Sequence, residues 1–154
     1  MGFTRSMRIS ASALTAERLR MDVVANNVAN AQTTGPDGPY RRQRVVLRPL
    51  DAEPARPSFG SVLRGQMASG AATPAVVGSG VQVVRVEEDP SPGETVYEPD
   101  HPDADENGYV TYPNVSVAAE IVDLLSATKA YQANVTVVNA LKSMAQKALS
   151  IGTR

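Results

Sequence analysis

The sequence predicts a mainly α-helical fold with a small β part. Long N- and C-terminal helices are expected to pack as a coiled-coil-like layer, with a short-stranded, β-rich segment between them. Three observations support this fold class. Apolar side chains recur every three or four residues through the last 38 residues, and less regularly through the first 31. The centre instead holds most of the prolines and glycines, among short runs with β-strand character.

The N-terminal helix is predicted from Ile9 to Ala31. Its apolar positions repeat at steps of seven or of three and four residues, as expected for a face that packs against another helix. Glu17 falls on this face and makes the pattern less regular. The positions expected to pack are Leu14, Met21, Val24 and Val28.

The middle of the chain is predicted to contain four short strands, at residues 44–47, 81–86, 95–97 and 109–112. Each is bounded by Pro, Gly or Asp, which favour turns. Residues 55–80 are rich in glycine and small side chains, and we expect a mobile loop there. Four such short strands predict a small sheet, and a sheet of this size is too small to support a large catalytic site.

The C-terminal helix is predicted to begin after Ser116, a suitable N-cap, and to end at Gly152. About 35 residues at 1.5 Å each give a rod of about 50 Å, too long for a globule of this size to cover. We therefore expect further chains to bury part of its surface, although a helical hairpin within one monomer is an alternative. The positions expected to pack are Ile121, Leu124, Tyr131, Val135, Val138 and Leu141.

The charge distribution supports three segments, at residues 1–31, 32–115 and 116–154. Residues 1–50 carry eight Lys or Arg and three Asp or Glu, a net charge of +5, whereas residues 51–116 carry three and eleven, a net charge of −8. Opposite charges within one chain favour contact between subunits. A basic stripe interleaved with aromatic side chains, typical of nucleic-acid binding, is missing from the sequence.

The residues that could support chemistry are few. The chain has no Cys and one His, which excludes thiolate metal sites, cysteine nucleophiles and sites with two imidazoles. Asp103–Gly108 matches the first half of a calcium loop, but Asn114 replaces the bidentate Glu of its twelfth position. His101 fits a solvated turn better than a catalytic relay. We predict no enzyme activity, cofactor or metal, and keep a calcium module and a small hydrolase as minor alternatives.

The polar stretch that ends the first helix, together with the aromatic residue after it, resembles the N-terminal signature of bacterial flagellar rod and hook proteins. Stretches at 88–92, 97–104, 108–115, 130–135 and 142–145 extend this resemblance to nearly the whole chain, apart from about residues 51–77. The sequence leaves open which of two glycines turns the chain before the aromatic residue, Gly35 or Gly38. The signature positions are Asn27, Asn30, Thr33, Thr34, Gly35 and Tyr40.

The resemblance implies a structural subunit of the flagellar proximal rod, a hollow shaft that crosses the periplasm and transmits motor torque. It implies export through the flagellar type III apparatus and helical assembly, with the terminal helices lining the interior. The expected partners are the chain itself, other flagellar rod proteins, the basal-body base and the export apparatus. Nucleic acid and direct membrane insertion are not expected. The alternative is a cytoplasmic coiled-coil adaptor.

Overall fold

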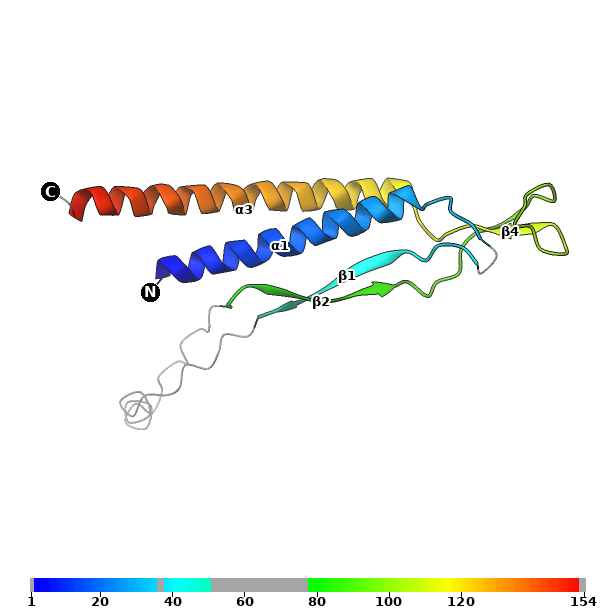
Figure 1. The fold of residues 1–154 in the computed structure, drawn as a ribbon, viewed down its shortest axis with the longest axis horizontal. Helices are drawn as coiled ribbons and strands as arrows, with labels where there is room; N and C mark the ends of the chain where they lie inside the picture. The colour runs from blue at the N-terminus through cyan, green and yellow to red at the C-terminus, as the bar shows by residue number, and fades with distance from the viewer. Residues whose placement is uncertain (1, 36–37, 51–77, 153–154) are drawn as a thin grey trace, which may run out of the picture.

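The computed structural model describes residues 2–35, 38–50 and 78–152. In chain order, the elements are α1 (Gly2–Ala29), β1 (Gln43–Pro49), β2 (Val81–Glu88), β3 (Thr95–Tyr97), β4 (Tyr109–Thr111) and α3 (Val117–Gly152). Figure 1 shows an elongated molecule in which the two helices lie together and the strands form a smaller part. The predicted fold class, mainly α with a small β part, is confirmed.

Helices α1 and α3 are antiparallel and pack against each other (Figure 1). At 1.5 Å per residue, the 28 residues of α1 span about 42 Å and the 36 residues of α3 about 54 Å. The helices diverge toward the start of α1, and α3 continues past it. Helix α1 begins seven residues before the predicted Ile9 and ends two residues before Ala31. Residues 3–8 contain no helix breaker, so the helix extends beyond its apolar face.

Strands β1 and β2 form an antiparallel ribbon that lies along α1 (Figure 1). The pairing runs from Gln43 opposite Glu88 to Pro49 opposite Val81, with one β-bulge within it. The Ser12 hydroxyl of α1 accepts a hydrogen bond from the Val81 N–H at 3.1 Å. This bond fixes the first residue of β2 on the helix.

Two backbone hydrogen bonds continue the pairing just beyond the Pro49–Val81 end of the ribbon. Leu50 N–H donates to Gly80 O at 2.8 Å, and Ser79 N–H donates to Leu50 O at 3.1 Å. Gly80 has a φ of +119°, and a Cβ there would collide with the Ser12 hydroxyl, so this position requires glycine. The mobile loop predicted at residues 55–80 lies outside the described residues up to residue 77.

Strands β3 and β4, with the loop that joins them, form what we call the tip (residues 94–112), at the far end of the molecule from the chain termini (Figure 1). Val110 is 1% exposed and is the apolar centre of the tip. The rings of Tyr97 and Tyr109 meet edge to face, with centroids 5.2 Å apart. Gly108, with a φ of +80°, makes the turn into β4.

The apolar core of the described residues is small. Fifteen large hydrophobic side chains are exposed, against five apolar side chains that are buried. None of the helices in the described part of the chain has an apolar stretch that could span a bilayer. The buried apolar residues are Ala16, Val23, Val24, Val110 and Ala127.

Candidate assembly site

The chain passes from α1 into β1 through a bend that we call the elbow (residues 26–43, of which 36 and 37 are not described). Asn27 lies at its centre and is fully buried. Its Nδ2 donates to Gln43 O at 2.8 Å, and its Oδ1 accepts from Gln43 N–H at 2.9 Å. These bonds imitate the pairing of neighbouring strands, so one side chain holds the first residue of β1 against the last turns of α1.

Tyr40 completes the bonding around Asn27. Its hydroxyl donates to Asn27 Oδ1 at 2.8 Å and accepts from Asn26 Nδ2 at 3.1 Å. Burial raises the pKa of Tyr40 above its ordinary value; the Asn26 hydrogen bond opposes this, and the negative charge of Glu120 adds to it. The phenol therefore stays protonated at neutral pH and remains a hydrogen-bond donor.

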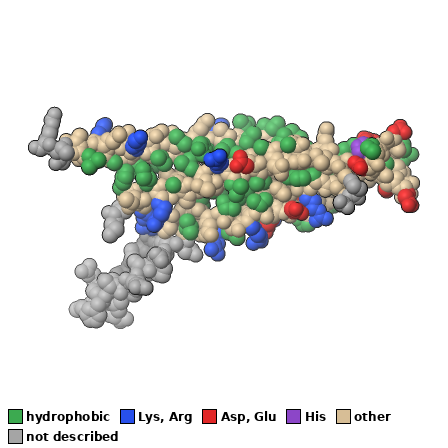
Figure 2. Space-filling model, in the orientation of Figure 1, with side chains coloured by type: hydrophobic (Ala, Val, Ile, Leu, Met, Phe, Trp, Pro, Cys, Tyr) green, Lys and Arg blue, Asp and Glu red, His purple; other side chains and the backbone are tan. Residues whose placement is uncertain are grey.

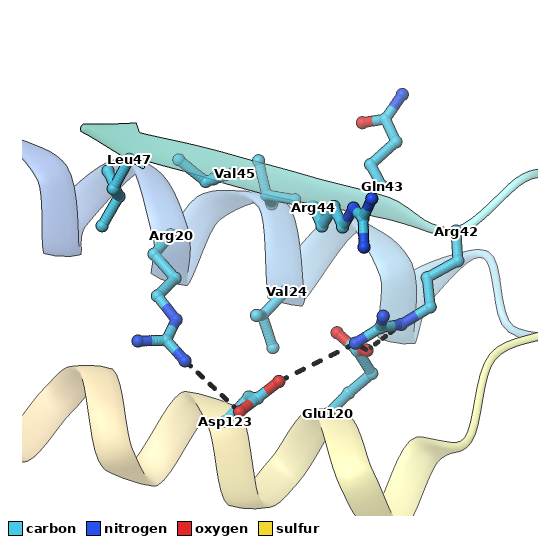
Figure 3. Close-up of a pocket in the computed structure, with 10 residues that line it drawn as sticks. Arg20, Val24, Arg42, Gln43, Arg44, Val45, Leu47, Glu120 and Asp123 are labelled. Carbon is cyan, nitrogen blue, oxygen red and sulfur yellow. Dashed lines mark hydrogen bonds and ion pairs between the residues drawn. The ribbon is translucent and has the colours of Figure 1, made fainter. Parts of the chain in front are cut away.

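The carboxylate of Glu120 joins α3 to the elbow. It is fully buried, its Oε2 accepts from Asn27 Nδ2 at 3.0 Å, and its Oε1 accepts from Arg42 Nε at 2.7 Å. Arg42 also approaches Asp123 at 3.8 Å, and Arg20 of α1 pairs with Asp123 at 3.4 Å (Figure 3). Removing one partner of a buried ion pair typically costs about 3–5 kcal/mol. This network therefore fixes the position of α3 relative to the elbow.

The other polar residues of the signature end α1 and tie it to the tip. Asn30 Nδ2 donates to Asn26 O at 2.9 Å, and the Thr33 hydroxyl donates to Asn30 Oδ1 at 3.2 Å. The Thr34 hydroxyl donates to Asp103 Oδ2 at 2.6 Å. The elbow therefore has a direct side-chain bond to the tip as well as its bonds to α3.

Gly38 makes the turn that returns Tyr40 to α1. Its φ is +108°, in the left-handed region, and its N–H donates to Gly35 O at 3.0 Å. Tyr40 N–H then donates to Thr33 O at 3.1 Å. Of the two glycines that the sequence left open, Gly38 has the left-handed conformation and Gly35 contributes its carbonyl group.

A groove of about 330 Å³ lies between α1, β1 and α3, beside the ion network (Figure 3). Its charged groups are already paired, including Arg44, whose guanidinium bonds Glu87 at 3.3 Å. The groove is therefore a joint between packed elements. Its lining consists of Arg20, Val23, Val24, Arg42, Gln43, Arg44, Val45, Leu47, Glu120 and Asp123.

The predicted packing positions differ in exposure. Val24 is 5% exposed, eight further positions are half-buried, and Ile121 is 47% exposed. Ala16 of α1 and Ala127 of α3 are the most deeply buried apolar side chains of the two helices, at 2% and 0% exposure, and sequence reasoning did not select Ala127. The half-buried predicted positions are Leu14, Met21, Val28, Leu124, Tyr131, Val135, Val138 and Leu141.

The segment that resembles half of a calcium loop is a hydrogen-bonded turn. Asp105 Oδ1 accepts from the N–H groups of Asn107 at 2.9 Å and Tyr109 at 2.8 Å. His101 Nδ1 accepts from Asp103 N–H at 3.1 Å, so it also belongs to a turn. The described residues contain no group of three or more His, Asp or Glu side chains placed to hold a metal ion.

Comparisons with known proteins identify the family of this chain. Residues 7–36 match the family described as "Flagella basal body rod protein", and residues 106–151 match "Flagellar basal body rod FlgEFG protein C-terminal". The chain is 48% identical over 153 residues to the flagellar basal-body rod protein FlgC of Bacillus subtilis, covering 96% of each chain. The chain belongs to the FlgC family of flagellar basal-body rod proteins. It is 43% identical to FlgC of Borreliella burgdorferi, over 98% of each chain, and 44% identical to FlgC of Salmonella typhimurium, over 94% of this chain and 93% of that one.

Membership of the FlgC family confirms the predicted resemblance and function. The chain is a structural subunit of the flagellar rod, belongs to the basal body and is not an enzyme. The cytoplasmic adaptor is not favoured. The two family matches cover most of α1 with the start of the elbow, and β4 with α3. They therefore include both helices and part of the elbow.

The structure brings together residues that sequence reasoning had not connected. Glu120 lies in the first turn of α3, where a carboxylate suits the positive end of a helix, but that position alone does not indicate its burial. Its partner Asn27 is 93 residues away in the chain, and Arg42 is 78 residues away. Gln43 and Arg42 directly follow the signature, and their closeness to Tyr40 is the one local indication of their role.

Proposed function

We propose that this FlgC-family chain is a subunit of the proximal rod, where it assembles with copies of itself and with other rod proteins into a hollow shaft that transmits motor torque. One observation carries this proposal: the helix pair exposes far more large apolar side chains than it buries. Burial of one such side chain contributes about 1.5–3 kcal/mol, which a solitary chain cannot gain at these positions. Neighbouring subunits supply the missing cover.

In this proposal, the three segments have separate roles. Residues 1–31 and 116–154 form the inner helical layer of the rod, and the predicted packing positions on α1 and α3 hold it together. Residues 32–115 form the outer part, which touches basic patches of neighbours. The charge of the tip supports this assignment, because residues 94–112 contain six Asp or Glu and no Lys or Arg.

The elbow signature sets the angle between the inner and outer parts. Asn27 bonds Gln43 and Tyr40 across the bend between α1 and β1. Asn30 and Thr33 bond each other within the bend, and Thr34 bonds Asp103 of the tip. A joint made of several short hydrogen bonds and a buried ion pair resists rotation more than an apolar contact of the same size. We propose that these residues give the subunit the stiffness that a rotating shaft requires.

We also infer that the chain reaches the rod through the flagellar type III export apparatus, contacts the basal-body base and export apparatus, and takes its place across the periplasm. The small apolar core supports this route, because a chain with few buried contacts is unfolded at low free-energy cost. Its lack of Cys also prevents a disulfide from blocking passage.

The variant Val135→Asp tests the assembly function. Val135 is half-buried along the helix contact, and a carboxylate there would be costly to bury between neighbouring helices. We expect the variant to be exported but to be lost from purified basal bodies, as measured by immunoblot of culture medium, cytoplasm and basal-body fractions.

Thr136→Asp is the matched control, since the adjacent Thr136 is exposed and the substitution adds the same charge. This control should enter basal bodies as the wild type does. Wild-type levels of Val135→Asp in basal bodies, or absence of the wild-type chain from them, would overturn the proposal.

A further inference from the structure

Helix α3 carries an exposed apolar patch near its start, which we call the amino-terminal patch: Val117, Ile121, Val122 and Leu125. These side chains are 42%, 47%, 65% and 56% exposed. The centre of this patch lies about a third of a turn around α3 from Glu120, Leu124 and Ala127, the less exposed side chains of the same turns. Figure 2 shows hydrophobic side chains along the outer edge of α3 in this region.

A second exposed apolar stripe lies near the end of α3, and we call it the carboxy-terminal patch: Val137, Met144 and Ile151. These residues recur every seven positions and are 46%, 56% and 76% exposed. A spacing of seven keeps the three side chains on one face of a helix, as in a helix-packing seam. The carboxy-terminal patch therefore has the pattern of a packing surface that lacks a partner within the described part of the chain.

The two patches have complementary electrostatic surroundings. After Asp123, α3 contains Lys129, Lys142 and Lys147 and no acidic residue, so the carboxy-terminal patch lies in a positive region. The amino-terminal patch lies next to the tip, where residues 94–106 carry six Asp or Glu and no Lys or Arg. Opposite charges around two apolar surfaces favour their association with each other over association with themselves.

The two patches also face different directions. At 3.6 residues per turn, their centres are about a third of a turn apart around the helix and about 35 Å apart along it. Two copies related by a two-fold axis either pair each patch with itself, which brings like charges together, or pair both patches at once along antiparallel helices. The second arrangement needs both patches on the same side of a straight helix, which their different directions do not allow. A copy shifted along the helix instead places one patch of the first chain beside the other patch of the second.

We propose that the amino-terminal patch of one copy binds the carboxy-terminal patch of a second copy, shifted by about 35 Å along parallel α3 helices. This inference rests on the proposed rod function and names the faces through which the helices of neighbouring copies meet. Such a head-to-tail contact leaves one patch of each copy free: the carboxy-terminal patch of the first copy and the amino-terminal patch of the second. Further copies can therefore add, and the contact repeats without closing into a dimer. Four side chains against three form a small contact compared with the roughly 20–30 residues a side of stable pairs, so the contact gains strength through repetition.

Cysteine cross-linking tests the proposal directly, because the chain has no native Cys. The variants Ile121→Cys and Met144→Cys are co-expressed in a flagellated bacterium in place of its own copy. Purified basal bodies are treated with a bis-maleimide reagent of about 8 Å reach, which suits the 8–10 Å between axes of packed helices. We expect a cross-linked dimer of this chain from the pair of variants, and loss of that dimer when either variant is present alone.

The control pair is Gln132→Cys and Asn139→Cys, two exposed polar positions of α3 outside both patches. It should give no dimer, since a shift of about 35 Å removes these positions from each other. Three results would overturn the proposal while leaving the rod function intact. They are a dimer from either single variant, a cross-linked product that contains another protein, and no product although both variants are in basal bodies. Absence of the wild-type chain from basal bodies would instead refute the rod function.

Discussion

Asn27 lies where α1, β1 and α3 meet, and its carboxamide bonds to both of the other elements. Its Nδ2 bonds Gln43 O and Glu120 Oε2, while its Oδ1 accepts from Gln43 N–H and the Tyr40 hydroxyl. Every donor and acceptor of the amide is therefore used. A buried Asn in a helical layer is known to fix register at some cost in stability, and here it also fixes where the first strand begins.

Asn27→Ala is expected to destabilise the free chain by about 2–3 kcal/mol, because it leaves the Gln43 backbone and Glu120 with unmade hydrogen bonds in a buried place. Urea unfolding followed by circular dichroism measures the change. Asn139→Ala, at an exposed position of α3, is the matched control and is expected to stay within about 0.5 kcal/mol of wild type. Equal stability of the two variants would contradict the role assigned to Asn27.

The sequence could indicate Asn27 and Tyr40 as special residues, because both belong to the signature that resembles flagellar rod and hook proteins. It could not predict Glu120 as their partner. A carboxylate in the first turn of a helix is explained by the helix dipole alone, so its burial against Arg42 leaves no local trace in the sequence. The sequence could therefore single out some of the important residues, but it could not predict the contacts among them, which depend on the tertiary fold.

Among the elements, the short pair β3 and β4 depends most on its turn. Three residues per strand give few ladder bonds, so the Asp105 carboxylate, which binds the N–H groups of Tyr109 and Asn107, contributes much of the order. Those hydrogen bonds, first of all the one from Tyr109, outweigh desolvation and lower the pKa of Asp105 from its ordinary 3.8. The charged form is therefore the one that holds the turn.

A group with a depressed folded pKa stabilises the structure above its unfolded pKa and loses that contribution as the pH falls through the folded value. We therefore expect the tip to loosen as the pH drops from 3.8 through the lower pKa of Asp105. The amide NMR shifts of Tyr109 and Asn107 report this change. In Asp105→Asn the acid transition of these shifts should vanish, whereas Glu106→Gln should keep it; an unchanged transition in Asp105→Asn would disprove the assignment.

The elements themselves were largely predictable from local pattern. The four strands lie within a few residues of the predicted ones, because turn residues bound each of them. The start of α1 was missed because residues 3–8 have little apolar periodicity, and a helix needs only the absence of breakers to continue. The arrangement of the strands as two separate pairs was not predictable, since three or four short strands also suit one sheet.

The whole molecule is an open structure with a thin core, ordered most strongly at the elbow. There the fully buried Asn27 of the elbow and Glu120 of α3 are hydrogen-bonded to each other, whereas the last turns of α3 extend beyond α1 with Met144 and Ile151 exposed. Local stability follows buried contact density, so the free chain should open from its termini toward the elbow.

Hydrogen exchange of the free chain checks this gradient. Amides of residues 140–152 are expected to exchange faster than those of residues 117–131, because the first group lacks the ion network and the closest helix contacts. In basal bodies the difference should shrink as neighbours cover α3. Uniform, slow exchange along α3 in the free chain would contradict an assembly-dependent fold.

The ion network lies at one end of the helix pair, while α3 continues alone at the other. The bonds around Glu120 therefore hold one end of the helix pair in place, whereas the far part of α3 depends on neighbouring subunits for cover. Subunits in a tube built from several kinds of protein do not all have geometrically identical surroundings. A subunit held firmly at one end and covered by its neighbours at the other can occupy such non-equivalent positions without breaking the bonds around Glu120.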